Sequence, residues 1–172
     1  QLDKQSDVIQ VVLASSDGGP PLVTATAQLV ASDTTHDLAV LQVDADAAAK
    51  LRPAVLGTSS DLKIGQQAFA VGNPYGLTRS LSAGVISGIN RSIPSPVGTL
   101  IYGVIQTDAK IDAGNSGGPL LDSEGHMVGI NTATYTRSGT GRGSGINFAL
   151  PMDMVRDIVP NLIVYGNAQG RR

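Results

Sequence analysis

The stretch Gly114-Asn115-Ser116-Gly117-Gly118-Pro119 carries more information than any other part of this 172-residue chain. Glycines two positions before and one position after the serine predict a sharp backbone turn. Such a turn exposes the Ser116 hydroxyl and directs the backbone N–H groups of Gly114 and Ser116 at one point. Because acyl transfer needs a nucleophile and two donors for the oxyanion, the stretch indicates a serine nucleophile. The alternative is a loop that merely turns, since Gly, Asn and Ser are the usual turn residues.

The composition around this turn favours β-structure. Hydrophobic residues make up 41% of the chain, which is enough for a core, but aromatic residues make up only 3%. The 21 glycines and 9 prolines are spread evenly and separate many short apolar runs, a pattern typical of all-β proteins. The length suits one ordinary domain or two small halves.

Charge and hydropathy exclude several classes of function. The net charge of −2 comes from interspersed acidic and basic residues, so nothing predicts binding to nucleic acid or to an anionic membrane. No apolar run approaches the roughly 18 to 20 residues that cross a bilayer. Without cysteine the chain has no disulfide and no thiolate metal site. A serine nucleophile requires no metal or organic cofactor, and none is expected. A first residue of Gln1, with no signal peptide, leads us to expect a processed or excised form.

Apolar periodicity predicts nine strands and one helix. The expected helix has its apolar face at residues 155, 158, 159, 162 and 163, and Pro151 can begin it near its first turn. Pro160 is expected to kink or split this helix, and Gly166 to end it. A strand over 80–89 is expected to be interrupted at Gly84 and Gly88. The other expected strands are 8–13, 23–30, 38–43, 67–72, 101–107, 119–122, 127–132 and 145–150, with turns at 15–21 and 73–76, a flexible loop at 139–144 and a loose basic tail at 170–172.

Several blocks of sequence, in order and spacing, resemble the HtrA/Deg serine proteases over residues 8–166. They read IQTDAKIDAGNSGG at 105–118, GINTA at 129–133, FALP at 148–151, GNPYGL at 72–77 and GVISG at 84–88. The resemblance implies a chymotrypsin-like double β-barrel. Residues 1–65 would be the remainder of a first barrel lacking its N-terminal strands, 66–151 the second barrel with the nucleophile, 152–166 a C-terminal helix and 167–172 a tail.

The resemblance also assigns a catalytic aspartate and leaves the histidine unassigned. The block Asp37-Leu38-Ala39-Val40-Leu41 makes Asp37 the residue that would orient the imidazole; alone, Asp37 would be read as the residue that opens a strand. His36 adjoins Asp37, so on a strand their side chains point to opposite faces, and His126 follows the turn 123–125. Both are predicted to be surface residues. The family's Asn-His-Val block would fall before Gln1, so the chain resembles a protease cut just after its histidine.

A substrate cleft follows from the same resemblance. Gly114 and Ser116 would supply the oxyanion hole, and residues 130–133, which include Ile130, Asn131 and Thr132, would pair with an extended peptide. The pocket for the residue before the cut would be mostly apolar and would accept small or medium aliphatic side chains. The walls of this pocket would be Ile111, Thr134 and Ile146. For Ile111 and Ile146, ordinary core packing is the alternative.

Residues 131–137 and 160–166 resemble the Deg protease of the plant and algal thylakoid lumen that lacks a PDZ domain. This implies a chloroplast lumenal endopeptidase of unfolded or damaged proteins, including photosystem II proteins. It also implies a homotrimer, or a hetero-oligomer with a PDZ-bearing Deg protease. Two alternatives stay open: a catalytically inactive subunit that binds peptides or acts as a scaffold, and an unstable fragment with an exposed sheet edge.

Overall fold

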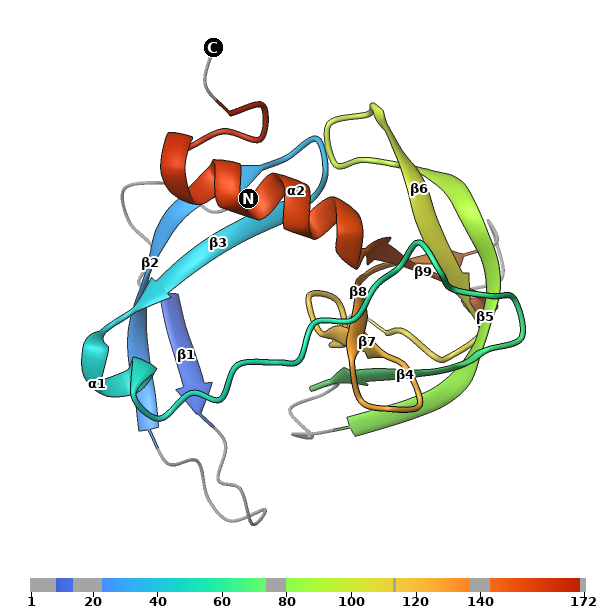
Figure 1. Cartoon of the computed structure of the whole chain (residues 1–172), viewed down its shortest axis with the longest axis horizontal. Helices are drawn as coiled ribbons and strands as arrows, with labels where there is room; N and C mark the ends of the chain where they lie inside the picture. Colours follow the sequence, from blue (N-terminus) through green and yellow to red (C-terminus); the bar gives the residue numbers. More distant parts are fainter. Residues whose placement is uncertain (1–8, 14–22, 74–79, 113, 137–142, 171–172) are drawn as a thin grey trace. The chain divides into compact units, whose positions relative to one another are not determined.

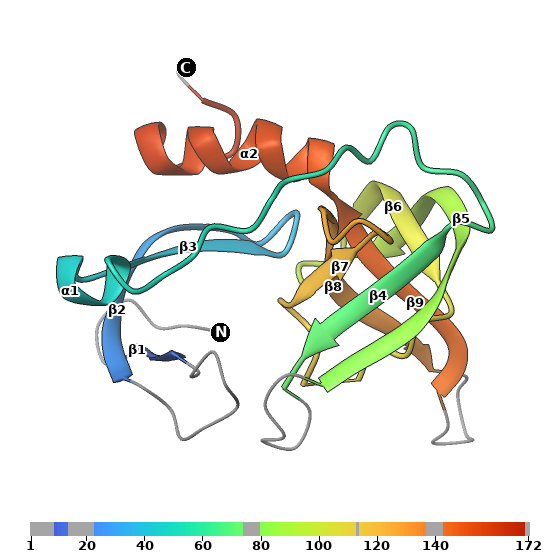
Figure 2. The same ribbon diagram turned by 60° about the horizontal axis from the view of Figure 1, so that its bottom comes forward.

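The computed structural model describes residues 9–13, 23–73, 80–112, 114–136 and 143–170. These form two compact units, one from residues 1–53 with 158–172 and the other from residues 54–157. Figures 1 and 2 show mostly antiparallel strands in both units. Expectations for the turn at 15–21, residues 74–76, the loop at 139–142 and the last two arginines fall outside the described residues.

The first unit contains a three-stranded antiparallel sheet in the order β1 (Ile9–Leu13), β2 (Val23–Asp33), β3 (Leu38–Val43), followed by the short helix α1 (Ala45–Ala48). Buried and exposed residues alternate along β2: the small residues Ala25 and Ala27 are buried, while their neighbours face outward. β2 runs beyond its predicted end at residue 30. The pairing with β3 shifts between Leu29 and Ala31, so a bulge at the exposed Val30 lets the strand continue to Asp33.

The second unit is a closed barrel with the strand order β4-β5-β6-β9-β8-β7. Its core is a cluster of small and branched apolar side chains that includes Ile86, Ile105 and Leu120. Within the described ranges, no helix has the length and apolar character that would let it cross a membrane. The strands are β4 (Gln67–Gly72), β5 (Ser80–Pro94), β6 (Leu100–Thr107), β7 (Pro119–Leu121), β8 (Met127–Thr136) and β9 (Gly143–Pro151).

β5 is not broken at Gly84, where the glycine serves a packing role, but its pairing with β6 shifts on both sides of Gly88, the second expected interruption. β5 is continuous from Ser80 to Pro94. A Cβ on Gly84 would lie 2.3 Å from the backbone N of Ala109 and 2.4 Å from Asp108 Oδ1. Gly84 therefore admits the chain that leaves β6, and the Val85 N–H donates to Asp108 Oδ1 at 2.7 Å. The start of the loop that leads to Ser116 is thereby attached to β5.

Helix α2 (Met152–Tyr165) passes through Pro160 without being split, which corrects one of the two outcomes predicted for this residue. Pro160 is exposed, whereas Val155, Ile158 and Leu162 are buried on one face. Burial on both sides of the proline keeps the helix intact although one backbone donor is missing. Gly166 ends it as predicted: its φ is 70°, and its N–H donates to Leu162 O at 3.0 Å.

Replacing Pro160 with alanine is expected to stabilise the protein. Alanine restores an N–H donor and removes a ring at an exposed site, and an interior proline costs about 3 kcal/mol relative to alanine in a helix. Because the native helix already accommodates the ring, we expect a gain of about 1 to 2 kcal/mol. Urea unfolding of Pro160→Ala measures this, with Ile163→Ala, at an equally solvent-facing position, as the control. A loss of stability in Pro160→Ala would show that the proline is required by its surroundings.

The segment before β4 is fixed to the barrel by hydrogen bonds far apart in sequence. The Ser60 N–H donates to Asp153 Oδ2 at 2.9 Å, and the Asp153 N–H donates to Ser59 Oγ at 3.0 Å. Ser59 thus caps the first turn of α2 from 94 residues away. The Met127 N–H donates to Val55 O at 2.8 Å, which extends the sheet beyond the start of β8.

This cap predicts an acid-dependent contribution to stability. Burial acts to raise the pKa of Asp153, but hydrogen bonds from Ser60 and Ser59 outweigh it and hold the pKa below the ordinary value of 3.8. A lowered carboxyl pKa contributes stability above the unfolded-state pKa, and this is lost as pH falls through the folded-state pKa. Asp153→Asn is therefore expected to lower the free energy of unfolding at neutral pH and to match the wild type at pH values below the lowered pKa. Urea unfolding across this range tests it, with the exposed Asp61→Asn as control, and a constant difference at every pH would contradict it.

Candidate active site

Ser116 lies in a turn between β6 and β7, where glycines make the required close approaches. Gly117 has a φ of 85°, a left-handed conformation that suits glycine. A Cβ on Gly118 would lie 2.1 Å from Val71 O, so the end of β4 packs directly on this turn. Ser116 is exposed, and its hydroxyl donates to Thr132 O at 3.3 Å. The turn thus presents the hydroxyl to solvent while the backbone around it is tightly packed.

Backbone hydrogen bonds fix the turn to β4 and β8. The Gly117 N–H donates to Asn131 O at 2.8 Å, and the Asn131 N–H donates to Gly118 O at 2.9 Å. The Asn73 N–H donates to Gly114 O at 2.9 Å. Among the described residues, no backbone carbonyl accepts from the N–H of Gly114 or Ser116. These are the two donors that the sequence predicts for an oxyanion.

Buried polar side chains hold the loop from residue 107 to the serine, and sequence reasoning missed them. Thr107 Oγ1 donates to Val85 O at 2.8 Å and accepts from the Ala109 N–H at 3.1 Å. Asn147 Nδ2 donates to Ala109 O at 2.9 Å. Asn115 Nδ2 donates to Lys110 O at 3.1 Å. A polar residue inside a strongly apolar strand, as at 107 and 147, was the available signal, because a buried polar side chain needs a partner.

The predicted substrate strand is used in part by the protein itself. The N–H and C=O of Asn131 bond to the serine turn, and Ile130 is paired with Pro119 of β7 and Leu150 of β9. Asn131 also has a buried side chain, with Nδ2 3.2 Å from Pro119 O. The backbones of residues 130 and 131 are therefore paired within the protein in this structure.

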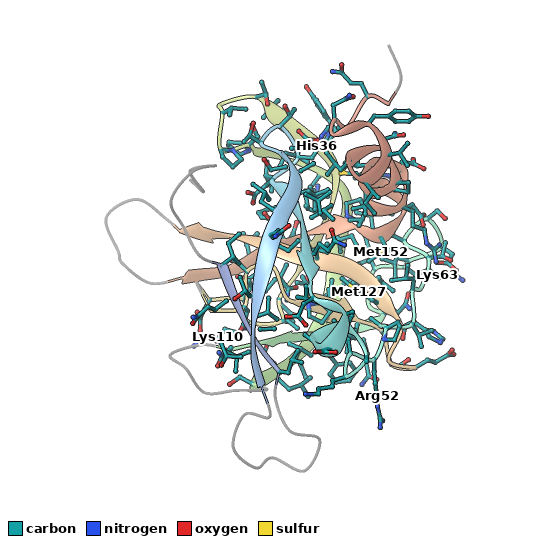
Figure 3. All side chains as sticks on the ribbon, turned by 90° about the vertical axis from the view of Figure 1, so that its left-hand side faces the viewer. His36, Arg52, Lys63, Lys110, Met127 and Met152 are labelled. Atoms are coloured by element: carbon teal, nitrogen blue, oxygen red, sulfur yellow. The ribbon has the colours of Figure 1, made fainter. Side chains whose placement is uncertain are left out.

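The three residues predicted to line the pocket differ in how far the structure exposes or describes them. Ile111 is 1% exposed and belongs to the apolar cluster of the barrel core, which agrees with the alternative of ordinary core packing. Ile146 is 36% exposed near the start of β9. The Thr134 side chain lies outside the described residues. Lys110, which is labelled in Figure 3, is exposed, and its Nζ lies 3.1 Å from Asp112 Oδ2.

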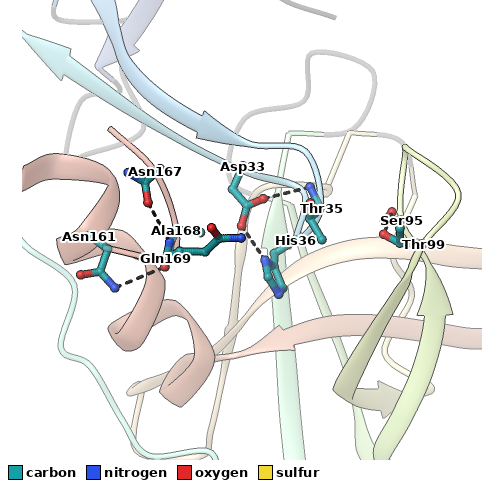
Figure 4. A network of polar contacts seen from close by, with 9 residues as sticks. All are labelled: Asp33, Thr35, His36, Ser95, Thr99, Asn161, Asn167, Ala168 and Gln169. Carbon is teal, nitrogen blue, oxygen red and sulfur yellow. Dashed lines mark hydrogen bonds and ion pairs between the residues drawn. The ribbon is translucent and has the colours of Figure 1, made fainter. Parts of the chain in front are cut away.

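Asp37 and His36 lie in the first unit, in the turn between β2 and β3. This differs from the premise that both lie on a strand. Asp37 is exposed and has a φ of 58°, which is unusual for a residue other than glycine. The His36 ring nitrogen Nδ1 donates to Asp33 Oδ2, and the Thr35 N–H donates to Asp33 Oδ1 (Figure 4). Asp33 therefore organises the turn that carries Asp37.

His126, in the second unit, is also engaged by carboxylates. Its Nδ1 lies 3.4 Å from Asp122 Oδ2 and 3.5 Å from Glu124 Oε2. Its backbone N–H donates to Asp122 Oδ1 at 2.9 Å, so Asp122 fixes the turn that precedes β8. Among the residues that the structure describes, no group of three or more His, Asp and Glu side chains is arranged to hold a metal ion.

Comparison with known proteins agrees with this geometry. Residues 3–130 match the model of the trypsin-like peptidase domain. The chloroplastic protease Do-like 5 of Arabidopsis thaliana is 57% identical over 141 residues, which cover 82% of this chain and 43% of that protein. A solved structure of Deg5 is 46% identical and superposes with a TM-score of 0.72 over 92% of this chain and 69% of that one. The HtrA-type protease AlgW with a decapeptide is 36% identical, with a TM-score of 0.74 over 91% of this chain and 45% of that one.

The chain spans less than half the length of this curated relative. The family match and the superpositions confirm the predicted fold class, a chymotrypsin-like architecture of antiparallel strands with a C-terminal helix. They also cover the blocks of sequence around Ser116 that carry the resemblance. The chain therefore belongs to the trypsin-like peptidase family, within its HtrA/Deg group of serine proteases.

Proposed function

We propose that the natural protein is a serine endopeptidase in which Ser116 attacks the scissile carbonyl. One observation carries the proposal: Ser116 is exposed on a tightly bonded turn, and the neighbouring N–H groups of Gly114 and Ser116 have no backbone acceptor among the described residues. A carbonyl oxygen placed between these two donors would gain stabilisation as it becomes an oxyanion. Tying the turn to β4 and β8 keeps the donors oriented before the substrate arrives.

The triad is completed by Asp37 and by a histidine that lies outside these 172 residues. The histidine takes the Ser116 proton and returns it to the leaving amine, while Asp37 holds the ring in its productive tautomer. Both histidines of the chain are engaged elsewhere, His36 by Asp33 and His126 by Asp122 and Glu124. The 172 residues alone are expected to be nearly inactive, because an oxyanion hole without a general base supports only a small fraction of the full catalytic rate.

The substrate is an extended polypeptide, as in unfolded or damaged proteins. The peptide adds as a strand beside residues 132–134, where main-chain hydrogen bonds give affinity with little dependence on sequence. The decapeptide in the AlgW structure supports extended peptides as ligands of that relative. Ile146 and Thr134 line the pocket for the residue before the cut, which favours small and medium aliphatic side chains.

The site of action is the chloroplast, in the thylakoid lumen, in the quality control of photosystem II proteins. The chloroplastic designation of the Arabidopsis relative supports the organelle. The protein acts as a homotrimer or together with a PDZ-bearing Deg protease. Size determination of the natural protein, alone and mixed with such a protease, separates these two assemblies.

Labelling with a fluorophosphonate probe tests the proposal. The longest natural form is treated with the probe, and the modified peptide is identified by mass spectrometry. We expect modification at Ser116 in the natural form and far slower modification in the 172-residue chain. A folded natural form that is not modified at Ser116, alone or with its partner, would contradict the proposal.

That negative result would favour the alternative, an inactive subunit that binds peptides or completes an oligomer. The engagement of both histidines by carboxylates is the observation on its side. Such a subunit would bind an extended aliphatic peptide without cleaving it, which fluorescence anisotropy of a labelled peptide measures.

A further inference from the structure

Asn115 is hydrogen-bonded to the loop around Ser116 through its backbone N–H, its backbone C=O and its side chain. Its N–H donates to Asp112 O at 2.9 Å, and its C=O accepts from the Gly118 N–H at 2.9 Å. Its side-chain Nδ2 donates to Lys110 O at 3.1 Å. Asn115 therefore forms one hydrogen bond across the turn before Ser116, one across the turn after it, and one back to Lys110.

The side-chain oxygen Oδ1 is the polar group of Asn115 that those three hydrogen bonds do not use. The side chain is only 4% exposed, and Oδ1 is buried without a hydrogen-bond donor among the described residues. Oδ1 rests against the backbone of Gly72, where a Cβ would lie 2.2 Å from it. A buried acceptor without a donor is energetically unfavourable. Only the donating half of the carboxamide is therefore used for hydrogen bonding.

This arrangement separates asparagine from the nearly isosteric aspartate. A carboxylate at position 115 would face the Lys110 carbonyl and would be buried where asparagine Oδ1 has no donor. A protonated carboxyl has an O–H that can replace the Nδ2 donor. The charged side chains of this loop are Lys110, which is 77% exposed, and Asp112, with which it pairs at 3.1 Å. Of β4, Gly72 lies against Asn115 and Val71 against Gly118, and of β8, Asn131 bonds to Gly117 and Gly118; none of these residues titrates.

We propose that Asn115 is a positioning residue whose neutral side-chain donor, bonded to Lys110 O, sets the direction of the two oxyanion N–H groups. The Ser116 N–H belongs to the peptide group that Asn115 shares with Ser116, so it turns directly with Asn115. The Gly114 N–H lies one peptide group earlier and is affected through the Gly114 backbone, whose C=O shares the other peptide group of Asn115. This inference rests on the proposed function, since it concerns the same oxyanion site. It adds a requirement for a neutral donor at position 115.

The test compares Asn115→Asp, Asn115→Ala and wild type in the natural full-length protein. The rate constant of fluorophosphonate labelling is measured from pH 5 to 8, and each variant is expressed as a ratio to wild type at the same pH. The ratio removes the titration of the catalytic base, which both proteins share. Thermal unfolding at each pH identifies conditions in which a variant is folded.

For Asn115→Asp the ratio is expected to rise at least about tenfold as pH falls, because burial raises the carboxyl pKa and protonation restores the donor. For Asn115→Ala it is expected to stay low, about tenfold below wild type or less, at every pH. Asn161→Asp is the matched control, since Asn161 Nδ2 also donates to a backbone carbonyl, that of Ala168, at 3.3 Å. Its ratio is expected to remain near one.

Each outcome decides the question. A pH-independent ratio for folded Asn115→Asp, or an Asn115→Ala variant that labels as fast as wild type, overturns the inference while labelling of wild type upholds the proposed function. If Asn115→Asp does not fold, peptide hydrolysis by Asn115→Ala decides: a lower kcat with unchanged KM supports positioning, and an unchanged kcat overturns it. A wild-type protein that is not labelled at Ser116 overturns the proposed function, and the inference with it.

Discussion

Ser116→Ala is expected to lower the kcat for peptide hydrolysis by the natural protein about 10⁵- to 10⁶-fold, the range seen when a triad serine is removed. The methyl group cannot attack the carbonyl, whereas the turn that holds it is fixed by backbone bonds from residues 117, 118 and 131, which the substitution leaves intact. Among the described residues, the side-chain bond that is lost is the long one from Ser116 Oγ to Thr132 O, at 3.3 Å. Stability is therefore expected to change by less than about 1 kcal/mol.

Ser123→Ala is the matched control, because Ser123 is also an exposed turn serine in the same unit. We expect its kcat to equal that of wild type. Hydrolysis of an unfolded protein substrate and of a short aliphatic peptide, measured with both variants, makes the comparison. Loss of activity in both variants, or in neither, would show that Ser116 is not the nucleophile.

Gly118→Ala is expected to have the largest effect on stability. Its added Cβ would lie 2.1 Å from Val71 O and 3.0 Å from Asn115 O, and both are backbone atoms that cannot move alone. Either β4 or the serine turn must shift, so we expect a loss of at least about 3 kcal/mol and a parallel loss of labelling at Ser116. Urea unfolding measures the first quantity and the probe the second.

The control for this prediction is Gly98→Ala. Gly98 has a φ of 82° and no atom within 4 Å of the position of an added Cβ. Its substitution is expected to cost about 1 to 2 kcal/mol through backbone strain alone. Equal effects at the two positions would mean that crowding by Val71 is relieved at little cost.

The sequence predicted the elements better than their ends. The nine strands and the helix are confirmed, because alternation and helical periodicity report directly on which side chains are buried. The continuation of β2 past Val30 depends on a bulge, and the continuity of β5 past Gly84 depends on a loop more than 20 residues away. Neither cause leaves a local signal.

The candidate site shows the same division. The serine turn and its glycines were predicted from six residues, because a left-handed φ and close packing limit the residue type. The use of the Asn131 backbone by the turn was not predicted, and for Ile111 the sequence left core packing and pocket lining as alternatives. Both depend on how β4, β7 and β8 are stacked, and an isoleucine in a pocket looks the same in sequence as an isoleucine in a core.

The barrel of the second unit is closed by pairing of β4 with β7 through Phe69 with Leu121 and Ala70 with Leu120. This is a short ladder, and β7 follows directly from the serine turn. Hydrogen exchange is expected to be faster along this seam than along β4–β5, because fewer bonds must break to open it. Opening the β4–β7 pairing would displace Ser116 while the other strands of the barrel stay paired. We therefore expect the lifetime of the reactive geometry at Ser116 to depend on the stability of this short pairing.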